Sequence, residues 1–175
     1  MGIEASIPFF SPQKFPTLAP LFGKDAKVPL IGLLFSAAWC PDCQPVVPKL
    51  ALLLSEEKEV ASYLLKIVYV GSEKTDEEMK EFLKRSSCDD LDEGVFTVID
   101  FDNVNERQGL KKHFKTCAAK EMKDVGLEKR SGGIPTLKIL DAKTATVVLE
   151  DAVPDLQKLS PSEVMKKWQA LVKSD

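Results

Sequence analysis

The sequence predicts an α/β fold with a central mixed β-sheet flanked by helices on both faces. Short, continuously apolar segments, typical of buried strands, alternate with segments whose apolar residues recur at helical spacing. The predicted order is βαβα, then βα, then ββα. Such alternation favours parallel strands joined by helices, and the hairpin near the end of the chain adds antiparallel strands.

The chain opens with a proline-rich segment, residues 1–27, which we expect to run over the surface as an N-terminal extension. A turn of helix is predicted near 18–22. Residues 28–36 are almost continuously apolar and form the central strand. A length of 175 residues is ordinary for one domain, so residues 28–175 are assigned to a single domain.

A long helix is predicted to follow the central strand. It begins at Pro41, because proline suits the first helical position, and continues to about residue 63. Pro48 lies inside it and is expected to cause a kink. The apolar run at 66–70 is the second strand.

A capping box opens the next helix. Thr75 precedes Glu78 by three residues, and the helix continues to about Arg85. An edge strand is then predicted at 95–99 and a helix at 103–114.

The last part of the chain is predicted to form a hairpin and a helix. Residues 135–140 and 145–150 pair across a turn that contains aspartate and threonine. Ser160 and Glu163 form a second capping box, and the final helix ends near Lys173.

Composition excludes several functions. A net charge of −3 gives no general attraction for nucleic acid, and no apolar run is long enough for a transmembrane helix. The first residues lack the basic and long apolar regions of a secretory signal, so we expect a cytoplasmic protein. Met1-Gly2 followed by Ser6 fits the N-myristoylation pattern, so Gly2 is a candidate acylation site. Acylation would add a membrane-associated pool; a nuclear pool is the other alternative.

Cys40 and Cys43 lie three residues apart where a strand gives way to a helix. The N-terminus of a helix presents positive partial charge, which favours a thiolate and indicates a redox dithiol. A structural zinc site would need four ligands, but the sequence has no second pair of this kind and His113 is its one histidine. We therefore expect no metal and no cofactor.

Two motifs identify a family resemblance. Trp39-Cys40-Pro41-Asp42-Cys43, followed by Ile134-Pro135-Thr136-Leu137 opening a strand, resembles the thioredoxin fold. The likeness is closer to tryparedoxins and nucleoredoxins, through residues 34–43, 68–73 and 133–137, and it covers about residues 20–150. The resemblance implies a cis Ile134–Pro135 bond beside the cysteine pair.

The resemblance also implies roles. Cys40 attacks a substrate disulfide and Cys43 resolves the mixed disulfide. Trp39 and Pro41 offer contact surface, and the backbone of Ile134, next to Pro135, pairs with an extended substrate. The implied partners are disulfide-containing proteins and an upstream reductant: thioredoxin reductase, glutathione or trypanothione. The alternative is a redox-sensitive, nucleoredoxin-like adaptor with little turnover.

Two positions depart from the family pattern. Asp42 stands where tryparedoxins and nucleoredoxins commonly carry proline, and its charge competes with the Cys40 thiolate for the field of the helix. Leu34 stands where thioredoxins bury an aspartate, so Asp42 or water would accept the proton of Cys43. The alternative is that Asp42 only caps the helix.

Three further features have no counterpart in the motifs. Residues 115–131 look like an insertion, which forms either a short helix beside the site or a solvated surface helix. Cys88 and Cys117 have no partner motif. They are either thiols without function or partners in a regulatory disulfide.

Overall fold

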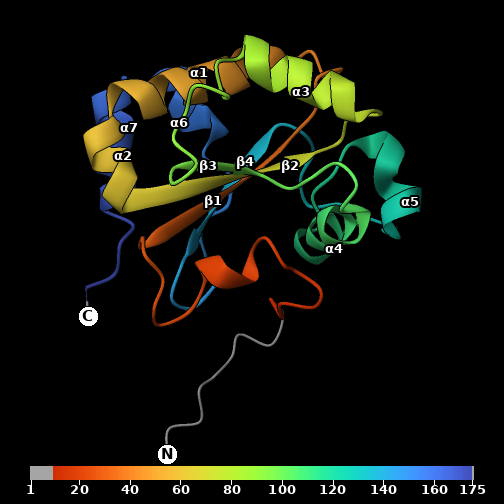
Figure 1. The fold of residues 1–175 in the computed structure, drawn as a ribbon, viewed down its shortest axis with the longest axis horizontal. Coiled ribbons are helices and arrows are strands. Elements are labelled where there is room, and N and C mark those ends of the chain that lie inside the picture. The colour runs from red at the N-terminus through yellow and green to blue at the C-terminus, as the bar shows by residue number, and fades with distance from the viewer. Residues whose placement is uncertain (1–9, 175) are drawn as a thin grey trace, which may run out of the picture.

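The computed structural model describes residues 10–174 and has a five-stranded mixed sheet at its centre, in the order β3-β2-β1-β4-β5 (Figure 1). The predicted fold class is confirmed. β1 pairs in parallel with β2, and β2 with β3, whereas β1–β4 and β4–β5 are antiparallel. Gly2, the candidate acylation site, lies outside the described residues. The strands are β1 Leu30–Ser36, β2 Leu65–Gly71, β3 Phe96–Val98, β4 Thr136–Asp141 and β5 Val147–Leu149.

Helices cover both faces of the sheet (Figure 1). One face carries α1, α3, α6 and α7, and the other carries α4 and the short 3₁₀ helix η1. None of the helices formed by residues 10–174 is long and apolar enough to cross a membrane. The helices are η1 Ala19–Leu21, α1 Cys43–Glu56, α2 Lys58–Leu64, α3 Asp76–Arg85, α4 Val104–Phe114, η2 Ala119–Glu121, α5 Met122–Val125, α6 Val153–Lys158 and α7 Pro161–Gln169.

The pleat of the central strand divides the core into two clusters. All seven residues of β1 are buried, as its apolar run predicts. Leu30 and Leu34 face the cluster under α1, whereas Ile31, Leu33 and Phe35 face the cluster under α4. The site described below lies at the carboxyl end of β1, on the α1 face.

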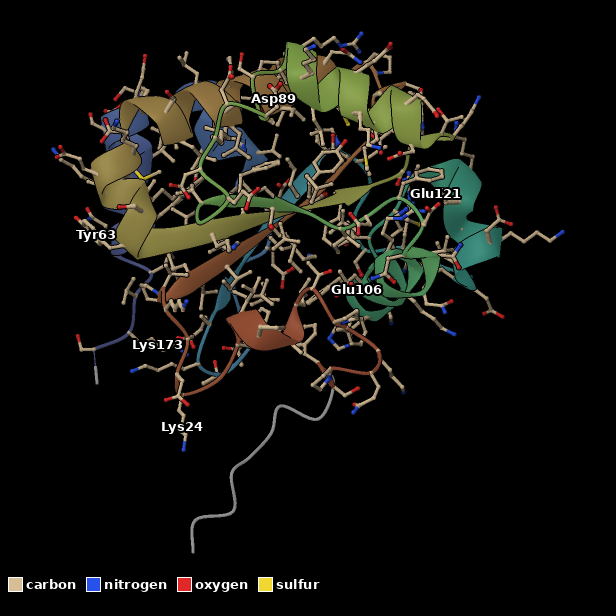
Figure 2. All side chains as sticks on the ribbon, in the orientation of Figure 1. Lys24, Tyr63, Asp89, Glu106, Glu121 and Lys173 are labelled. Atoms are coloured by element: carbon tan, nitrogen blue, oxygen red, sulfur yellow. The ribbon has the colours of Figure 1, made fainter. Side chains whose placement is uncertain are left out.

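The N-terminal segment packs against the domain. Phe10, Phe15 and Leu18 are buried in the cluster under α4, so the extension also contributes to the core. The reason is a buried carboxylate on α4: Glu106 Oε1 accepts the backbone N–H of Thr17 at 2.9 Å and that of Leu18 at 3.0 Å. Glu106 is labelled below the sheet in Figure 2.

The predicted long helix is two helices. Residues 40–44 form two overlapping four-residue turns, with Cys43 N–H bonded to Cys40 O, so α1 begins two residues after Pro41. α1 continues through Pro48 and ends before Glu57, whose φ and ψ of −103° and 25° leave the helical region. The break therefore falls where the sequence carries only charged helix-forming residues.

The end of the chain differs from the prediction by one helix. α6 was not predicted; Pro154 lies in its first turn, where proline is tolerated. The final helix ends at Gln169 instead of Lys173. The capping box of Ser160 and Glu163 is confirmed in both directions. At α3, Thr75 caps Glu78 N–H as predicted, but the Glu78 carboxylate bonds to Lys74 N–H instead.

Candidate functional site

The cysteine pair lies at the junction of β1 and α1. Cys43 is the first residue of α1 and is fully buried. Cys40 is also buried, with 5% of its surface exposed. Its side chain packs into the cluster under α1, with Trp39 and Ile134 against that cluster. A substrate must therefore approach closely before its disulfide meets the Cys40 sulfur.

The loop before β4 reaches the cysteine pair. The Ile134–Pro135 peptide bond is cis, as the resemblance implies. The Cys40 Sγ atom lies 3.8 Å from the Ile134 carbonyl oxygen, which makes a long S–H···O contact. Residues separated by 94 positions in the sequence are thus brought together by the antiparallel pairing of β1 with β4.

A groove of about 480 Å³ runs beside this contact. The α1 end forms one wall and the loop that contains Pro135 forms the other, while the third side comes from the segment entering α6. Asp42 and Asp151 both line it with exposed side chains. Asp42 occupies the N-cap position of α1 but its side chain makes no capping hydrogen bond, so the alternative of a capping aspartate is not supported. The remaining lining residues are Pro41, Pro45, Gly132, Gly133, Ile134, Thr136, Val153 and Gln157.

Trp39 is held on two sides. Its indole Nε1 donates a hydrogen bond of 2.8 Å to the Ser72 carbonyl oxygen at the end of β2. Lys120 Nζ lies 3.4 Å from the centroid of the Trp39 ring, which is within cation–π range. The half-buried tryptophan is therefore fixed beside the Cys40 thiol.

Lys120 belongs to the predicted insertion, which forms η2 and α5. Its neighbour Glu121 accepts hydrogen bonds from Ser72 Oγ at 2.8 Å and from Lys111 Nζ at 2.7 Å. In Figure 2, Glu121 is labelled between α4 and α5. Val125 is buried. The insertion thus forms a short helix that is attached to the site through Lys120 and Glu121, while Lys123 and Asp124 of α5 are exposed.

Burial separates the chemistry of the two thiols. Desolvation raises the pKa of Cys43 from 9.0 to about 12, and the adjacent Cys40 thiol adds to the effect. The Ser36 hydroxyl beside Cys43 acts in the opposite direction, because it stabilises the thiolate. Cys43 therefore stays protonated at neutral pH unless a base takes its proton.

Sequence reasoning missed Glu73. It follows β2, where an acidic residue is usually solvated, yet it is 6% exposed. Its Oε1 accepts the Ala38 backbone N–H at 3.0 Å and the Tyr69 hydroxyl at 2.5 Å. Leu34, at the position noted above, is fully buried. The buried acid of this site thus comes from the end of β2 instead of from β1.

The other two cysteines, Cys88 and Cys117, are buried as well. All four cysteines are free thiols. Burial raises the pKa of Cys88 to about 12 and also raises the pKa of Cys117. Cys117 N–H bonds to the Gly132 carbonyl oxygen, next to the loop that contains Pro135. Within residues 10–174, no cluster of three or more potential ligand side chains is arranged to hold a metal ion.

Comparison with known proteins places the chain in a family. A thioredoxin-like family model matches residues 29–147, so the chain belongs to the thioredoxin-like family. A search of curated proteins gave no match. The family match agrees with the expected range of resemblance, and it includes the cysteine pair and the loop that contains Pro135.

Solved structures share the fold at low sequence identity. Thioredoxin from Wuchereria bancrofti is 21% identical, with a TM-score of 0.54 and 83% of each chain covered. Tryparedoxin I from Crithidia fasciculata is 24% identical, with a TM-score of 0.53 over 74% of this chain and 73% of that one. A tryparedoxin II complexed with glutathionylspermidine is 18% identical, with a TM-score of 0.56 over 81% and 77%. These similarities show the fold.

Proposed function

We propose that this protein is a thiol–disulfide oxidoreductase that reduces disulfides by exchange with the dithiol of Cys40 and Cys43. One observation carries the proposal: the Cys40 sulfur lies 3.8 Å from the carbonyl oxygen of Ile134, a residue that lines the groove beside it. A nucleophilic sulfur and a stretch of backbone suited to hold an extended substrate are therefore adjacent.

The difference in burial indicates which of the two sulfurs reacts first. Cys43 is fully buried and cannot meet an external disulfide, whereas Cys40 is slightly exposed. Cys40 attacks one sulfur of the substrate disulfide, and the first substrate thiol leaves as the mixed disulfide forms. Cys43 then attacks the Cys40 sulfur, which releases the second substrate thiol and leaves a Cys40–Cys43 disulfide. Two electrons pass from the protein to the substrate.

The groove indicates how a substrate is held. An extended segment on either side of the substrate disulfide would pair with the backbone at Ile134, beside Pro135. Pro41 in the groove wall and the half-buried Trp39 next to Cys40 would supply contact surface. Asp42 adds a carboxylate next to the reacting sulfurs, where its negative charge repels a thiolate. This chemistry suits the cytoplasm, where thiols are kept reduced.

An upstream reductant returns the disulfide to the dithiol. A structural relative is complexed with glutathionylspermidine, so a glutathione-type thiol is the first reductant to test. Thioredoxin reductase and trypanothione are the other two. Each is supplied to the oxidised protein in turn, and recovery of free thiols is measured.

Trapping tests the assignment of the sulfurs. A Cys43→Ser variant is expected to retain substrates as mixed disulfides on Cys40, and a Cys40→Ser variant is expected to retain none. Mass spectrometry identifies the linked cysteine. Equal or better trapping by Cys40→Ser would reverse the two roles.

Turnover tests the reaction class. Wild-type protein is expected to accelerate insulin reduction by dithiothreitol, and the Cys40→Ser variant is the matched control. A rate equal to background would favour the adaptor without turnover.

A further inference from the structure

Two buried polar atoms near Cys43 have no hydrogen-bond partner within residues 10–174: Ser36 Oγ and Glu73 Oε2. Ser36 is fully buried. Unpaired buried polar atoms are rare and costly in folded proteins, so each one needs an explanation.

Strand register places both residues around Gly71. Ser36 pairs with Gly71 across the parallel β1–β2 ladder, in which neighbouring strands lie about 4.8 Å apart. A Cβ atom on Gly71 would lie 2.3 Å from Glu73 Oε2. The Glu73 carboxylate therefore occupies the place beside Ser36 that a side chain at position 71 would fill.

Tyr69 and the backbone hold one oxygen of this carboxylate and leave the other unpaired. Tyr69 O–H and Ala38 N–H both donate to Oε1. Tyr69 and Cys43 belong to the same cluster, so the carboxylate lies on the α1 face of the sheet with the thiol. Ser36 lies two residues after Leu34 on β1 and so shares its face, the α1 face that also holds Cys43 and Tyr69. A hydroxyl on this face favours the charged form of both groups.

The surrounding charges suit a base. Burial raises the pKa of Glu73, which makes its carboxylate a stronger base than an exposed one, and Glu78 of α3 adds to this effect. Arg107 and Lys111 of α4 face it as cations, and Glu121 of η2 partly neutralises them. Burial and Glu73 raise the pKa of Tyr69 well above 10.0, so the phenol stays protonated and keeps donating to Oε1.

We propose that Glu73 accepts the proton of Cys43 through the Ser36 hydroxyl when the mixed disulfide is resolved. The inference rests on the proposed oxidoreductase function. The Cys43 S–H proton passes to Ser36 Oγ as the Ser36 proton passes to Glu73. The Cys43–Cys40 S–S bond then forms, the Cys40–substrate bond breaks, and the substrate leaves as a thiolate.

Glu73 takes the place of Asp42 as the base. Asp42 is exposed at the groove, whereas Cys43 lies fully buried behind it. The buried carboxylate is reached without water. Glu73 acts through Ser36, so it is a positioning and proton-accepting residue and does not touch the substrate.

One equivalent of 5,5′-dithiobis(2-nitrobenzoate) separates the two steps by absorbance. Attack by Cys40 releases the first thionitrobenzoate, and resolution by Cys43 releases the second. In Glu73→Gln, which keeps the size and the hydrogen-bond acceptor, the first phase is expected to be unchanged. The second phase is expected to slow about 100-fold at pH 7, the lower range for loss of a general base. Its rate should then rise tenfold per pH unit, following the Cys43 thiolate.

Control variants separate the outcomes. Glu77→Gln removes the same charge from an exposed position of α3 and is expected to leave both phases unchanged. Ser36→Ala, which leaves Glu73 in place, is expected to slow the second phase as Glu73→Gln does. If Glu73→Gln does not unfold cooperatively, and is therefore not properly folded, the Ser36→Ala variant tests the proton transfer in its place.

Failure of the inference differs from failure of the function. A wild-type protein without a second phase would overturn the oxidoreductase function. A wild-type second phase that is unaltered in Glu73→Gln and Ser36→Ala would overturn the inference alone. Slowing by Asp42→Asn, with no effect of Glu73→Gln, would assign the base to Asp42.

Discussion

The ammonium group of Lys120 lies over the face of the Trp39 ring, 3.4 Å from its centroid. The two residues come from the insertion and from the cysteine motif, which are 81 positions apart. The insertion thereby covers one face of the Trp39 ring.

We expect Lys120→Gln to increase the quenching of Trp39 fluorescence by acrylamide, because the ring loses its cover. Folding stability should fall by about 0.5 kcal/mol, the low end of cation–π energies for exposed pairs. Trp168, the other tryptophan, is fully buried and supplies a constant background. Lys123→Gln, at another exposed position of the same segment, is the control. Equal quenching in both variants would contradict the contact.

Gly71→Ala should destabilise the protein by about 1–3 kcal/mol, the usual cost of overpacking a core. The added methyl group would meet Glu73 Oε2 at 2.3 Å and Tyr69 Cε1 at 3.1 Å. Gly94→Ala is the matched control, because its methyl group would meet only an exposed side chain, that of Asp92. Chemical denaturation measures both. A stability loss no larger for position 71 than for position 94 would argue against a buried Glu73.

Cys88 gives a prediction for alkaline pH. Burial raises the pKa of its thiol from 9.0 to about 12, so the folded state retains a proton that the unfolded state loses. This contribution is fully present below pH 9 and is lost as the pH rises toward 12. In that window, the unfolding free energy of wild type should fall about 1.4 kcal/mol per pH unit more steeply than that of Cys88→Ala. Below pH 8 the two curves should run parallel, and divergence there would refute the assignment.

Asp42→Asn should make the Cys40–Cys43 couple more oxidising by at most about 20 mV, because an exposed carboxylate near a thiolate costs about 1 kcal/mol or less in water. Asp42→Pro should shift the potential in the same direction. Equilibration with glutathione buffers measures it. The shift should shrink at high salt, and a shift in the opposite direction would exclude the tuning role of Asp42.

The sequence was sufficient to predict those features that depend on a local pattern of residues. The continuous apolar run predicted β1 to within two residues of its start, and the two motifs named Cys40 and Ile134, which the fold brings together. Glu73 could not be predicted, because its burial depends on the missing side chain of Gly71 and on the hydroxyl of Tyr69. α6 was missed because a proline reads equally as a breaker and as a first-turn residue.

The N-terminal segment held by Glu106 has a practical consequence for dissecting this protein. The family match begins at residue 29 and ends at residue 147. A fragment cut to those limits would lose Phe10, Phe15 and Leu18 from one side of the sheet, and Trp168 from the other. Both apolar surfaces would then meet water, and such surfaces promote aggregation. A fragment intended to carry the site must therefore include the segments that flank the homologous region.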